Sequence, residues 1–565
     1  MATLPTFIGQ FITRTDYNSS SVVFFSIVNT KNQDIIIGNS IDELLGSIIQ
    51  NHVTNLYIHD FNYIASYIID YVLKNNFTYN PNGRFDFIGD FGYNLFRDDV
   101  GHVYYIKLFF KTSNGRQSCE FRSSKNKTMS SIASMYKSFG LNIDTDIDIS
   151  KISDSTIQLG TDDELTEQLM EQTIIGAKIV ASVIKELKKV GYSKLTIGSD
   201  AVKQWLKLDG DQTGDLVHLD SDIDKDLRFA YRGGFTWINP KYENKVINDG
   251  IVLDVNSLYP YVMRYCRLPY GYPTWTTEEP SEDSYYIAHV CVTATLKNNH
   301  IPCISNMFHS DPGAASIVSN EYLDELVSAD IWLTNYDLDL LYNNYDIDSI
   351  KYYGAYVFKT REGMFNNFID HHYEIKRNSI GAKRQLSKLM LDSLYGRFGI
   401  KTNKKTSLPI MDNGKIKYIE GRELEDRTVR YLPIAIFITS IARYLIINEG
   451  LSVMDRLVYI DTDSLHLIGT DIPEGFDISD KLGDYKIESK FVRAKYVGLK
   501  TYIHDDITDS GIKTSITMAG APDTVKQNIN WDNFTYGTVV PGKYFIRTLP
   551  GGCIRCLTTF KITSV

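Results

Sequence analysis

Short apolar runs alternate with longer runs of helical period over residues 1–192. The run NLYIHD (55–60) predicts a strand, and the amphipathic pattern from Tyr63 to Leu73 predicts a helix after it. Thr161 and Glu164 have the spacing of a capping box, so a long helix is predicted to begin at Thr161 and to end near Gly191. The apolar stripe of this helix consists of Leu165, Leu169, Ile179, Val183 and Leu187. This alternation predicts an N-terminal domain of α/β type.

Two later apolar runs end in carboxylates. The run IVLDVNSLYP (251–260) predicts a strand that ends at Asp254, followed by a tight turn toward Tyr259. In LVYIDTDSLHLIG (457–469), two apolar segments flank Asp461 and Asp463 and predict a β-hairpin with both carboxylates at its turn. An Asp-Thr-Asp turn is more often a solvated loop, and an Asp after an apolar strand occurs in many α/β proteins without a role. Neither run is therefore strong evidence by itself.

The run GAKRQLSKLMLDSLYGRFG (381–399) predicts a helix with two different faces. At about 100° per residue, Arg384, Lys388 and Tyr395 fall within ~40° of one another. The opposite side is apolar and predicts contact with a core, through Leu386, Leu389 and Met390. Basic residues along a helix are usually only its solvated face, so this pattern also needs support from elsewhere.

Two further segments carry turn signals. The run FAYRGGFTWINP (229–240) is aromatic and strand-like, but Gly233 and Gly234 interrupt it. In IMDNGKIKYI (410–419), Asp412-Asn413-Gly414 predicts the turn of a β-hairpin. The sequence contains no internal repeat, coiled coil or low-complexity tract.

Composition bounds the class of protein. Hydrophobic residues make up 43% and charged residues 23% of the 565 residues, which is typical of a soluble protein with several domains. No run of ~18 consecutive apolar residues is present, so no membrane-spanning segment is predicted, and the first residues lack the pattern of a secretory signal. The six cysteines are scattered, which suits a reducing compartment. Cys553 and Cys556 have no second pair for a zinc site and are predicted to lie in a C-terminal strand.

The formal net charge is −10, which by itself argues against a nucleic-acid-binding protein, because contacts to phosphates need Lys and Arg. Net charge averages a local basic channel with a local acidic site. Nucleic acid therefore remains a possible partner.

Together, the three chemistry-bearing runs supply the groups that phosphoryl transfer from a nucleoside triphosphate requires. Two divalent ions ~3.5–4 Å apart stabilise the attacking and leaving oxygens, and Mg²⁺ binds through a few carboxylates plus substrate phosphates. Asp254 and Asp463, each at a strand end, can supply such a site, while Arg384 and Lys388 can hold the triphosphate. Tyr395 offers a flat ring against which a base or sugar can rest. The presence of all three runs in one chain is stronger evidence than any of them alone.

The same runs resemble known motifs. DVNSLYP, KLMLDSLYG and YIDTDS resemble motifs A, B and C of the family B DNA polymerases. Lys500-Thr501-Tyr502 resembles that family's Lys-x-Tyr motif, which contacts the primer terminus, and Tyr231-Arg232-Gly233-Gly234 resembles its Tyr-x-Gly-Gly motif. The match covers nearly the whole chain. It is closest to the protein-primed branch, found in bacteriophages whose linear genomes carry a terminal protein at each 5′ end.

The resemblance implies a multidomain α/β and α+β fold, shaped as a right hand with palm, fingers and thumb. An N-terminal ribonuclease-H-like domain of the exonuclease type and two insertions complete it. The ~120 residues between Pro260 and Gly381 are too many for a loop and fit a folded insertion. The implied boundaries are 1–192 for the exonuclease-like domain, 193–266 and 431–523 for the two parts of the palm, 267–362 for the first insertion, 363–400 for the fingers, 401–430 for the second insertion and 524–565 for the thumb.

The resemblance also implies roles for single residues. Asp254 and Asp463 would ligate two Mg²⁺ ions, for which Mn²⁺ can substitute, with Asp461 supporting them. Tyr259 would pack under the sugar of the incoming nucleotide and exclude a 2′-hydroxyl. The remaining nucleotide contacts would come from Lys376, Arg384, Lys388 and Tyr395. Asp392 departs from the family, which usually has Asn at this position, so nucleotide affinity or metal preference is expected to differ.

The exonuclease-like domain is expected not to proofread, because the positions of its four carboxylates hold other residues. The four carboxylate positions correspond to Gln10, Ile12, Ile64 and Gly176, of which isoleucine and glycine cannot ligate Mg²⁺, and Gln172 stands where the third motif has its tyrosine. Asp16 and Asp60 are too few to rebuild a two-metal site. His59, Tyr63 and Tyr67 keep the character of single-strand contacts, so the domain remains a candidate surface for DNA or the terminal protein.

The expected function is template-directed DNA synthesis that starts on the hydroxyl of a terminal protein and replicates a linear viral genome with strand displacement, in the cytoplasm of a host cell. The expected partners are template and primer DNA, deoxynucleoside triphosphates and a terminal protein, with the chain as a monomer or as a heterodimer with that protein. Two alternatives stay open. One is a conventional polymerase that extends a DNA primer, and the other is a catalytically weak subunit that binds DNA or the terminal protein.

Overall fold

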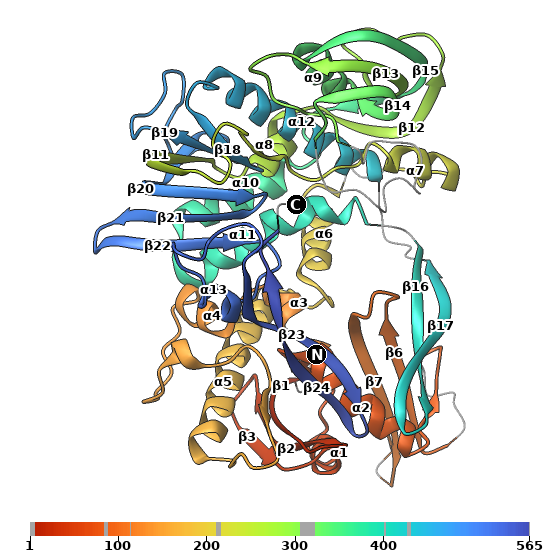
Figure 1. The fold of residues 1–565 in the computed structure, drawn as a ribbon. Coiled ribbons are helices and arrows are strands. Elements are labelled where there is room, and N and C mark those ends of the chain that lie inside the picture. Colours follow the sequence, from red (N-terminus) through yellow and green to blue (C-terminus); the bar gives the residue numbers. More distant parts are fainter. Residues whose placement is uncertain are drawn as a thin grey trace.

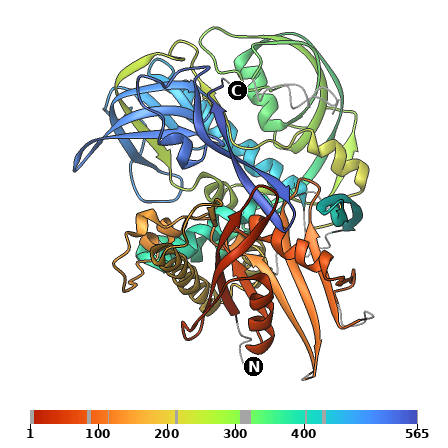
Figure 2. The same cartoon turned by 60° about the horizontal axis from the view of Figure 1, so that its bottom comes forward.

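The computed structural model describes residues 6–83, 89–113, 115–210, 216–305, 322–400, 403–425 and 431–563. The chain folds into an N-terminal domain, drawn at the bottom of Figure 1, and an upper half built around a second sheet. Figure 2 brings the N-terminal domain forward. In both views the blue C-terminal hairpin reaches from the upper half down to that domain.

The N-terminal domain is a mixed sheet with helices on both faces. Its strand order is β3-β2-β1-β4-β8-β7-β6-β5, with β9 paired to β1. The side chains of β1 alternate between two cores, since Phe7 and Phe11 face one and Ile8 faces the other. The strands are β1 (Thr6–Thr15), β2 (Ser20–Asn29), β3 (Ile35–Gly38), β4 (Asn55–Ile58), β5 (Thr78–Tyr79), β6 (Phe91–Arg97), β7 (Val103–Thr112), β8 (Gly115–Ser123) and β9 (Ile157–Leu159). The helices are α1 (Ile41–Gln50), α2 (Phe61–Lys74), α3 (Lys125–Thr128), α4 (Ile132–Ser138) and α5 (Glu167–Lys189).

The strand predicted at 55–60 and the helix predicted after it are confirmed as β4 and α2. The predicted start of the long helix at Thr161 is wrong. Helix α5 begins at Glu167, where the side chain of Thr166 accepts a hydrogen bond from the Leu169 amide. Residues 160–163 form a turn instead, because the Gly160 amide bonds to the Asp163 carboxylate at 2.6 Å and Arg14 bonds to the Asp163 carbonyl at 2.9 Å.

The upper half is organised by a seven-stranded antiparallel sheet in the order β10-β18-β19-β11-β20-β21-β22. Its strands are β10 (Thr236–Ile238), β11 (Val246–Val255), β18 (Leu457–Asp461), β19 (Ser464–Ile468), β20 (Tyr485–Gly498), β21 (Thr501–Thr508) and β22 (Gly511–Met518). Helices α8 (Leu258–Tyr265) and α12 (Leu432–Ser452) pack beside it. Among the described residues, α12 is the one helix long and apolar enough to cross a membrane. However, 72% of that stretch is buried inside the protein, as in a core helix.

A separate four-stranded sheet, in the order β12-β15-β13-β14, lies at the top of Figure 1. It consists of β12 (Leu268–Thr276), β13 (Tyr285–Leu296), β14 (Glu325–Thr334) and β15 (Tyr345–Arg361), with α9 (Asn335–Asn344) packed against it. Helix α7 (Ser221–Arg228) lies close by, and the Asp226 carboxylate accepts a hydrogen bond from the Tyr356 hydroxyl at 3.1 Å.

Helices α10 (Asn366–Asn378) and α11 (Gly381–Leu394) form an antiparallel pair beside α6 (Ile197–Leu208). Trp205 of α6 joins them. Its indole nitrogen donates to the Met364 carbonyl at 2.9 Å, and its ring stacks on Phe365 with the centroids 5.1 Å apart. The helix predicted over 381–399 ends early, since residues 395–397 form a 3₁₀ turn.

Two long hairpins link the halves. The first joins β16 (Asn403–Asp412) to β17 (Lys415–Glu425), and its turn at Asn413 and Gly414 has positive φ angles of 50° and 74°, as predicted from the Asp-Asn-Gly signal. The second, the C-terminal hairpin, joins β23 (Val539–Leu549) to β24 (Gly552–Lys561) after the short helix α13 (Asp523–Lys526). Cys553 and Cys556 lie in β24, as predicted. Both hairpins contact α2 of the N-terminal domain.

Candidate active site

Asp254 and Asp463 lie at the same end of neighbouring strands of the seven-stranded sheet. Asp254 is directly opposite Ser464 in the β11–β19 register, and the Val255 amide donates to the Asp463 carbonyl at 2.8 Å. Strands β18 and β19 form the predicted hairpin, with Asp461 and Asp463 at its turn. The strand and hairpin predictions are therefore confirmed, and the fold brings their carboxylates together.

The carboxylate turn is held in an unusual backbone conformation. Thr462 has a φ of 63°, in the left-handed region, and its amide donates to the Phe235 carbonyl at 2.6 Å. Gly234 packs directly against this turn. A Cβ at Gly234 would lie 2.5 Å from Cγ2 of Thr462 and 2.8 Å from the Tyr259 hydroxyl, so a larger residue does not fit.

Charge is concentrated at this edge of the sheet. Burial, and next the nearby Asp254 carboxylate, raise the pKa of Asp463 to about 7. Burial and Asp254 also raise the pKa of Glu488, on β20. Two lysines counter the negative charge: Lys486 forms an ion pair with Asp254, and Nζ of Lys500 lies 2.7 Å from Oδ1 of Asp461.

Sequence reasoning missed Lys486 and Glu488. The period-2 alternation of charged residues in KIESK (486–490) is the one signal that could have found them, and it also fits an ordinary solvent-facing strand.

The donor set fits a metal that substrate helps to bind. In the part of the chain that the structure describes, no three His, Cys, Asp or Glu side chains are grouped so as to hold a metal ion by themselves. Mg²⁺ is commonly bound by one or two carboxylates together with substrate phosphates and water. Mutual repulsion of the carboxylates around Asp463 is also the setting in which a divalent cation stabilises a site.

Basic side chains of α10 and α11 lie beside the strand end. Nζ of Lys376 donates to Oγ of Ser257 at 2.8 Å, and Arg384 donates to the Lys376 carbonyl at 2.6 Å. Lys388 and Asp392 lie in the same charged group. Burial raises the pKa of Asp392, and the charges of Lys388 and Lys376 oppose that shift. The structure therefore brings Lys376, Arg384 and Lys388 toward the turn that follows Asp254.

Tyr259 and Tyr395 form the other wall of this site. Their ring centroids are 4.4 Å apart. Burial, with Tyr395 as the next cause, raises the pKa of Tyr259 well above its usual range, so its hydroxyl stays protonated. Tyr395 lies in the 3₁₀ turn and not on the α-helix as predicted, but it still faces Tyr259.

The Tyr231–Gly234 segment and the loop at Lys500 line one cavity of about 370 Å³. The backbone amide of Lys500 donates to the Tyr459 hydroxyl at 2.7 Å, which fixes the position of this loop. Tyr502 packs into the aromatic cluster around Tyr459, with the centroids 5.5 Å apart. The carbonyls of Arg232 and Gly233 accept hydrogen bonds from Arg443 of α12, at 3.3 and 3.1 Å.

The degenerate exonuclease positions fall inside the N-terminal domain. Gln10, Gln172 and Gly176 line a cavity of only about 10 Å³, and Ile12 and Ile64 are fully buried in apolar cores. Asp16 and Asp60, the two other acids of this region, lie in different settings. Asp16 sits in an exposed turn, where its carboxylate accepts the amides of Asn18 and Ser19, whereas Asp60 pairs with Arg555.

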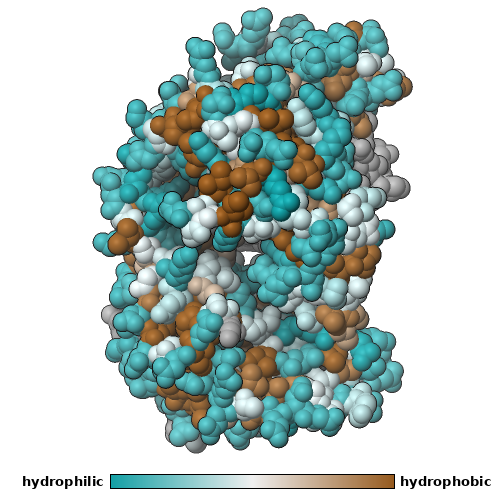
Figure 3. All heavy atoms as spheres, turned by 60° about the vertical axis from the view of Figure 1, so that its left-hand side comes forward, coloured by the Kyte–Doolittle hydropathy of each residue, from teal (hydrophilic) through white to brown (hydrophobic). Residues whose placement is uncertain are grey.

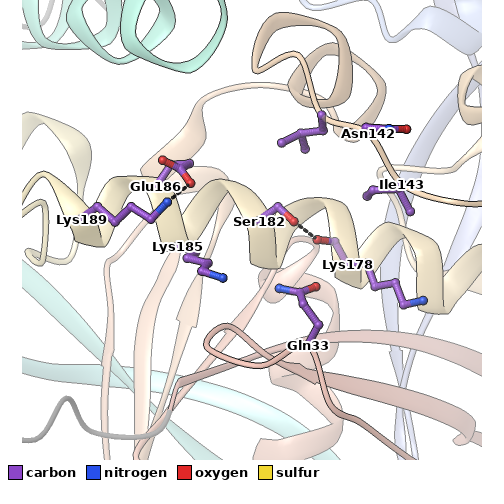
Figure 4. A pocket seen from close by; sticks show the side chains of 9 residues that line it. Gln33, Asn142, Ile143, Lys178, Ser182, Lys185, Glu186 and Lys189 are labelled. Atoms are coloured by element: carbon purple, nitrogen blue, oxygen red, sulfur yellow. Dashed lines mark hydrogen bonds and ion pairs between the residues drawn. The ribbon is translucent and has the colours of Figure 1, made fainter.

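A second hollow, of about 430 Å³, lies beside α5 in the N-terminal domain. Figure 4 shows Lys178, Lys185 and Lys189 of α5 along one side of it, with Gln33 opposite. Lys189 is paired with Glu186 at 2.6 Å. None of the described residues that line this hollow is a candidate active-site residue or a degenerate exonuclease position. The candidate site itself lies in the upper half. Figure 3, which looks onto the left-hand side of Figure 1, shows a narrow opening near the centre of the molecule.

A paired-carboxylate edge on an antiparallel sheet, faced by a basic helix pair and an aromatic wall, defines a template-directed nucleotide polymerase. The sequence profile described as DNA polymerase type B, organellar and viral, matches residues 47–480, and the chain belongs to this family. It is therefore an enzyme, a DNA-directed DNA polymerase with the right-hand fold. Membership also implies a general dependence on divalent metal ions.

Phage polymerases are similar over nearly the full length. The DNA polymerase of Bacillus phage phi29 is 32% identical over 590 aligned positions, which cover 98% of each chain. The DNA polymerase of Streptococcus phage Cp-1 is 33% identical over 61% of this chain and 62% of its own. The structure of the phi29 enzyme complexed with primer-template DNA matches with a TM-score of 0.89 at 30% identity, over 99% of this chain and all of that one. These relatives are phage proteins, which indicates a viral protein that acts in a host cell.

Proposed function

We propose that this polymerase adds deoxynucleotides to a 3′ hydroxyl by two-metal phosphoryl transfer, begins on the hydroxyl of a terminal protein, and copies a linear viral genome in the host cytoplasm. The observation that supports this most strongly is the convergence of Asp254 and Asp463 at one sheet edge, beside Lys376 and Arg384. A subunit that only binds DNA has no need of two half-buried carboxylates side by side.

Each group has a task in the transfer. When bound by Asp254 and Asp463, two Mg²⁺ ions (or Mn²⁺) would supply the charge that stabilises the attacking and leaving oxygens. Lys376, Arg384 and Lys388 hold the triphosphate from the opposite side. Asp461 and Lys500 fix each other at the carboxylate turn, and Lys500 with Tyr502 and the Tyr231–Gly234 segment positions the primer strand.

The sugar pocket is set by Tyr259. Its ring is packed against Tyr395 and its hydroxyl against Gly234, so it cannot swing aside. A ribose 2′-hydroxyl would need the volume that this ring fills. Tyr259 therefore selects deoxynucleotides.

The first insertion (267–362) suits a basic protein partner. It contains 14 acidic and five basic residues, a net charge of −9 against −10 for the whole chain. Such a surface repels the phosphate backbone and attracts a positively charged protein. We assign the docking of the terminal protein to it.

The second insertion (401–430) has the opposite character, with eight basic and five acidic residues. Its hairpin reaches the N-terminal domain, where Arg97 donates to Ser407 at 2.6 Å and its guanidinium lies 3.6 Å from the Tyr418 ring centroid. A positively charged arm between the two halves suits contact with the template and separation of a downstream duplex.

The N-terminal domain is proposed not to proofread. The cavity of about 10 Å³ at Gln10, Gln172 and Gly176 is far smaller than the hundreds of Å³ that a nucleotide requires. Of the described residues that line it, none carries a carboxylate.

The decisive experiment is protein priming. The enzyme is incubated with a candidate terminal protein, template and labelled deoxynucleotide, and a covalent protein–nucleotide adduct is expected. Extension of a DNA primer without any adduct would favour a conventional polymerase, and no incorporation on either substrate would favour a binding subunit.

A further inference from the structure

Five polar side chains form a continuous row between strand β21 and the turn that carries Asp461 and Asp463. They are Asp506 and His504 of β21, Tyr496 of β20, and His466 and Ser464 of β19. The last four are almost completely buried, with at most 5% of the surface of each exposed. Buried polar groups destabilise a protein unless each is hydrogen-bonded, so the bonds within this row decide its structure. We call these five side chains the polar relay.

Nδ1 of His504 carries a proton, because it faces an ionised carboxylate. It lies 3.6 Å from Oδ1 of Asp506. Burial works to raise the pKa of Asp506, but hydrogen bonds from His504 and Ser515 hold that pKa below its usual value. The carboxylate is therefore ionised near neutral pH and can only accept hydrogen bonds. Whether the His504 ring is charged then depends on its other nitrogen, Nε2, which lies 2.8 Å from the Tyr496 hydroxyl.

The Tyr496 hydroxyl contacts two histidine rings and has one proton to donate. Besides His504, it contacts Nδ1 of His466 at 2.9 Å. Burial raises the pKa of Tyr496 well above its usual range, so the hydroxyl stays protonated. Burial lowers the pKa of His466 well below its usual value, so this ring is neutral and has a single N–H. When the hydroxyl donates to one histidine, the other histidine must therefore donate to the hydroxyl oxygen.

The proton on Nε2 of His504 sets the direction of the whole polar relay. With that proton present, His504 donates to Tyr496, and Tyr496 donates to Nδ1 of His466. The single N–H of His466 is then on Nε2 and donates to Oγ of Ser464, 3.3 Å away. The Ser464 hydroxyl is left to donate to the Asp461 carbonyl, at 3.3 Å.

Loss of the same proton reverses every bond. Tyr496 then donates to Nε2 of His504 and accepts the N–H of His466, which is now on Nδ1. Nε2 of His466 becomes an acceptor, and the Ser464 hydroxyl turns to it. The Asp461 carbonyl loses that donor. The two states differ by one proton, which is exchanged with water.

The Asp461 carbonyl is a fixed point of the carboxylate turn. It also accepts the Asp463 amide at 2.7 Å. Thr462, between the two carboxylates, has a φ of 63°, and a β-branched residue keeps such a conformation only when neighbouring contacts hold it. The Ser464 hydroxyl is a further contact of this kind. Its loss therefore loosens the segment that carries Asp463.

We propose that His504 is a positioning residue for nucleotide addition, whose protonated ring orients the polar relay so that Ser464 holds the Asp461 carbonyl, and whose neutral ring releases it. This inference rests on the proposed role of the carboxylate turn in the transfer. The titratable groups that face His504 come from three strands. They are Asp506 and Tyr502 of β21, Glu488 and Tyr496 of β20, and His466 of β19.

His504→Gln tests the polar relay through the pH dependence of the rate. The glutamine amide places an N–H donor near the position of Nε2 and does not titrate, so the bond from Ser464 to Asp461 is kept at every pH. Single-nucleotide addition is measured by rapid quench between about pH 5.5 and about pH 8.5, where histidine changes charge. Equal rates are expected at the acidic end, and the ratio of wild-type to variant rate should fall several-fold through one ionisation as the pH rises. Asp463, with its pKa of about 7, is present in both proteins, so its own ionisation cancels in the ratio. A ratio that is constant over this range would overturn the proposal.

Tyr496→Phe is the matched variant, because it keeps the His504 ring and removes the hydroxyl that joins the two histidines. Its rate, divided by that of His504→Gln, is expected not to change with pH. If Tyr496→Phe keeps the pH dependence of the wild type, the His504 charge acts through space and the proposal is wrong. Primer extension by Asp463→Ala would instead overturn the proposed function, so the two failures are distinguishable.

Nuclear magnetic resonance of the wild-type enzyme with isotope-labelled histidine gives a readout that needs no activity and no stable variant. The His466 ring is expected to change from the Nε2–H tautomer to the Nδ1–H tautomer as His504 loses its proton. The same His466 tautomer on both sides of the His504 ionisation would contradict the proposal.

Discussion

Arg443 and Asp337 form a bidentate ion pair in the interior of the upper half, in which Nε donates to Oδ1 at 3.2 Å and Nη2 donates to Oδ2 at 2.9 Å. The two side chains are 1% and 2% exposed. Arg443 also donates to the carbonyls of Arg232 and Gly233. One guanidinium therefore joins α12, helix α9 and the Arg232–Gly233 segment next to the turn at Asp461 and Asp463.

We predict that Asp337→Ala destabilises the protein strongly, because it leaves the Arg443 charge buried without its partner. The free energy of unfolding should fall by about 3–5 kcal/mol, measured by urea denaturation. Asp471→Ala is the matched control. It breaks the pair with Arg456, but Asp471 is 81% exposed and the cost should stay below about 1 kcal/mol. Equal effects of the two variants would contradict the interior role of Asp337.

Asp254→Ala and Asp463→Ala are each predicted to abolish nucleotide addition while DNA binding persists. The carboxylates act on the transferring phosphoryl group, whereas DNA is held mainly through backbone contacts elsewhere. Primer extension and gel-shift titration measure the two properties separately, with Asp471→Ala again as the control. Undiminished extension by either variant would refute the assignment as metal ligands.

Tyr259→Val should relax sugar selection. The ratio of the specificity constants for deoxynucleotide and ribonucleotide is expected to fall by about tenfold or more, since removing the ring frees the volume of a 2′-hydroxyl. Steady-state kinetics with matched dNTP and rNTP pairs gives this ratio. If both constants drop equally, Tyr259 is a packing residue and not a selector.

Replacing residues 401–430 with a short Gly-Ser link is predicted to spare gap filling and to stall synthesis at a downstream duplex. The β16–β17 hairpin is lost, but Asp254, Asp461 and Asp463 are unchanged. A milder variant, Arg97→Ala, should weaken strand displacement in the same direction by loosening the contact with Ser407 and Tyr418. Equal rates on gapped and duplex templates would count against this role.

A duplex with a labelled, mismatched 3′ nucleotide is predicted to remain intact with the enzyme and Mg²⁺ or Mn²⁺ when no nucleotides are present. The reason is that Gln10, Ile12, Ile64 and Gly176 leave no carboxylates for a two-metal hydrolytic site. Thin-layer chromatography of released label provides the measurement. Release that persists in Asp463→Ala would show that the N-terminal domain does edit.

Local patterns in the sequence were reliable where short-range chemistry decides the structure. The carboxylate hairpin at 461–463 and the turn at Asn413 and Gly414 depend on neighbouring residues, and both were predicted correctly. The start of α5 was not, because a contact from Arg14 holds residue 163 in a turn that the capping pattern cannot reveal.

Partners distant in sequence were beyond prediction from a single chain. Lys486 meets Asp254 across 232 positions, and Arg443 meets Asp337 across 106. Each is an unremarkable charged residue in its own segment, and only the register of the strands and the packing of α12 bring it to its partner. The expectation that Tyr63 is a single-strand contact is wrong for the same reason. Its side chain is fully buried, and its hydroxyl donates to the Cys553 carbonyl, 490 positions away in the sequence.

Cys553 of the C-terminal hairpin is buried in the core of the N-terminal domain, and this has a consequence for the folding of the chain during its synthesis. The N-terminal domain leaves the ribosome first, yet its apolar core includes Cys553, which is synthesised 490 residues after Tyr63. Until residue 553 has been synthesised, the Tyr63 and Tyr67 face of α2 is therefore uncovered. Contacts of such sequence separation form slowly and leave an early-folded domain prone to association in the interval. Nascent chains that stop before residue 549 should accordingly be more susceptible to proteases and aggregation than the finished enzyme, although every motif of the active site is already present in them.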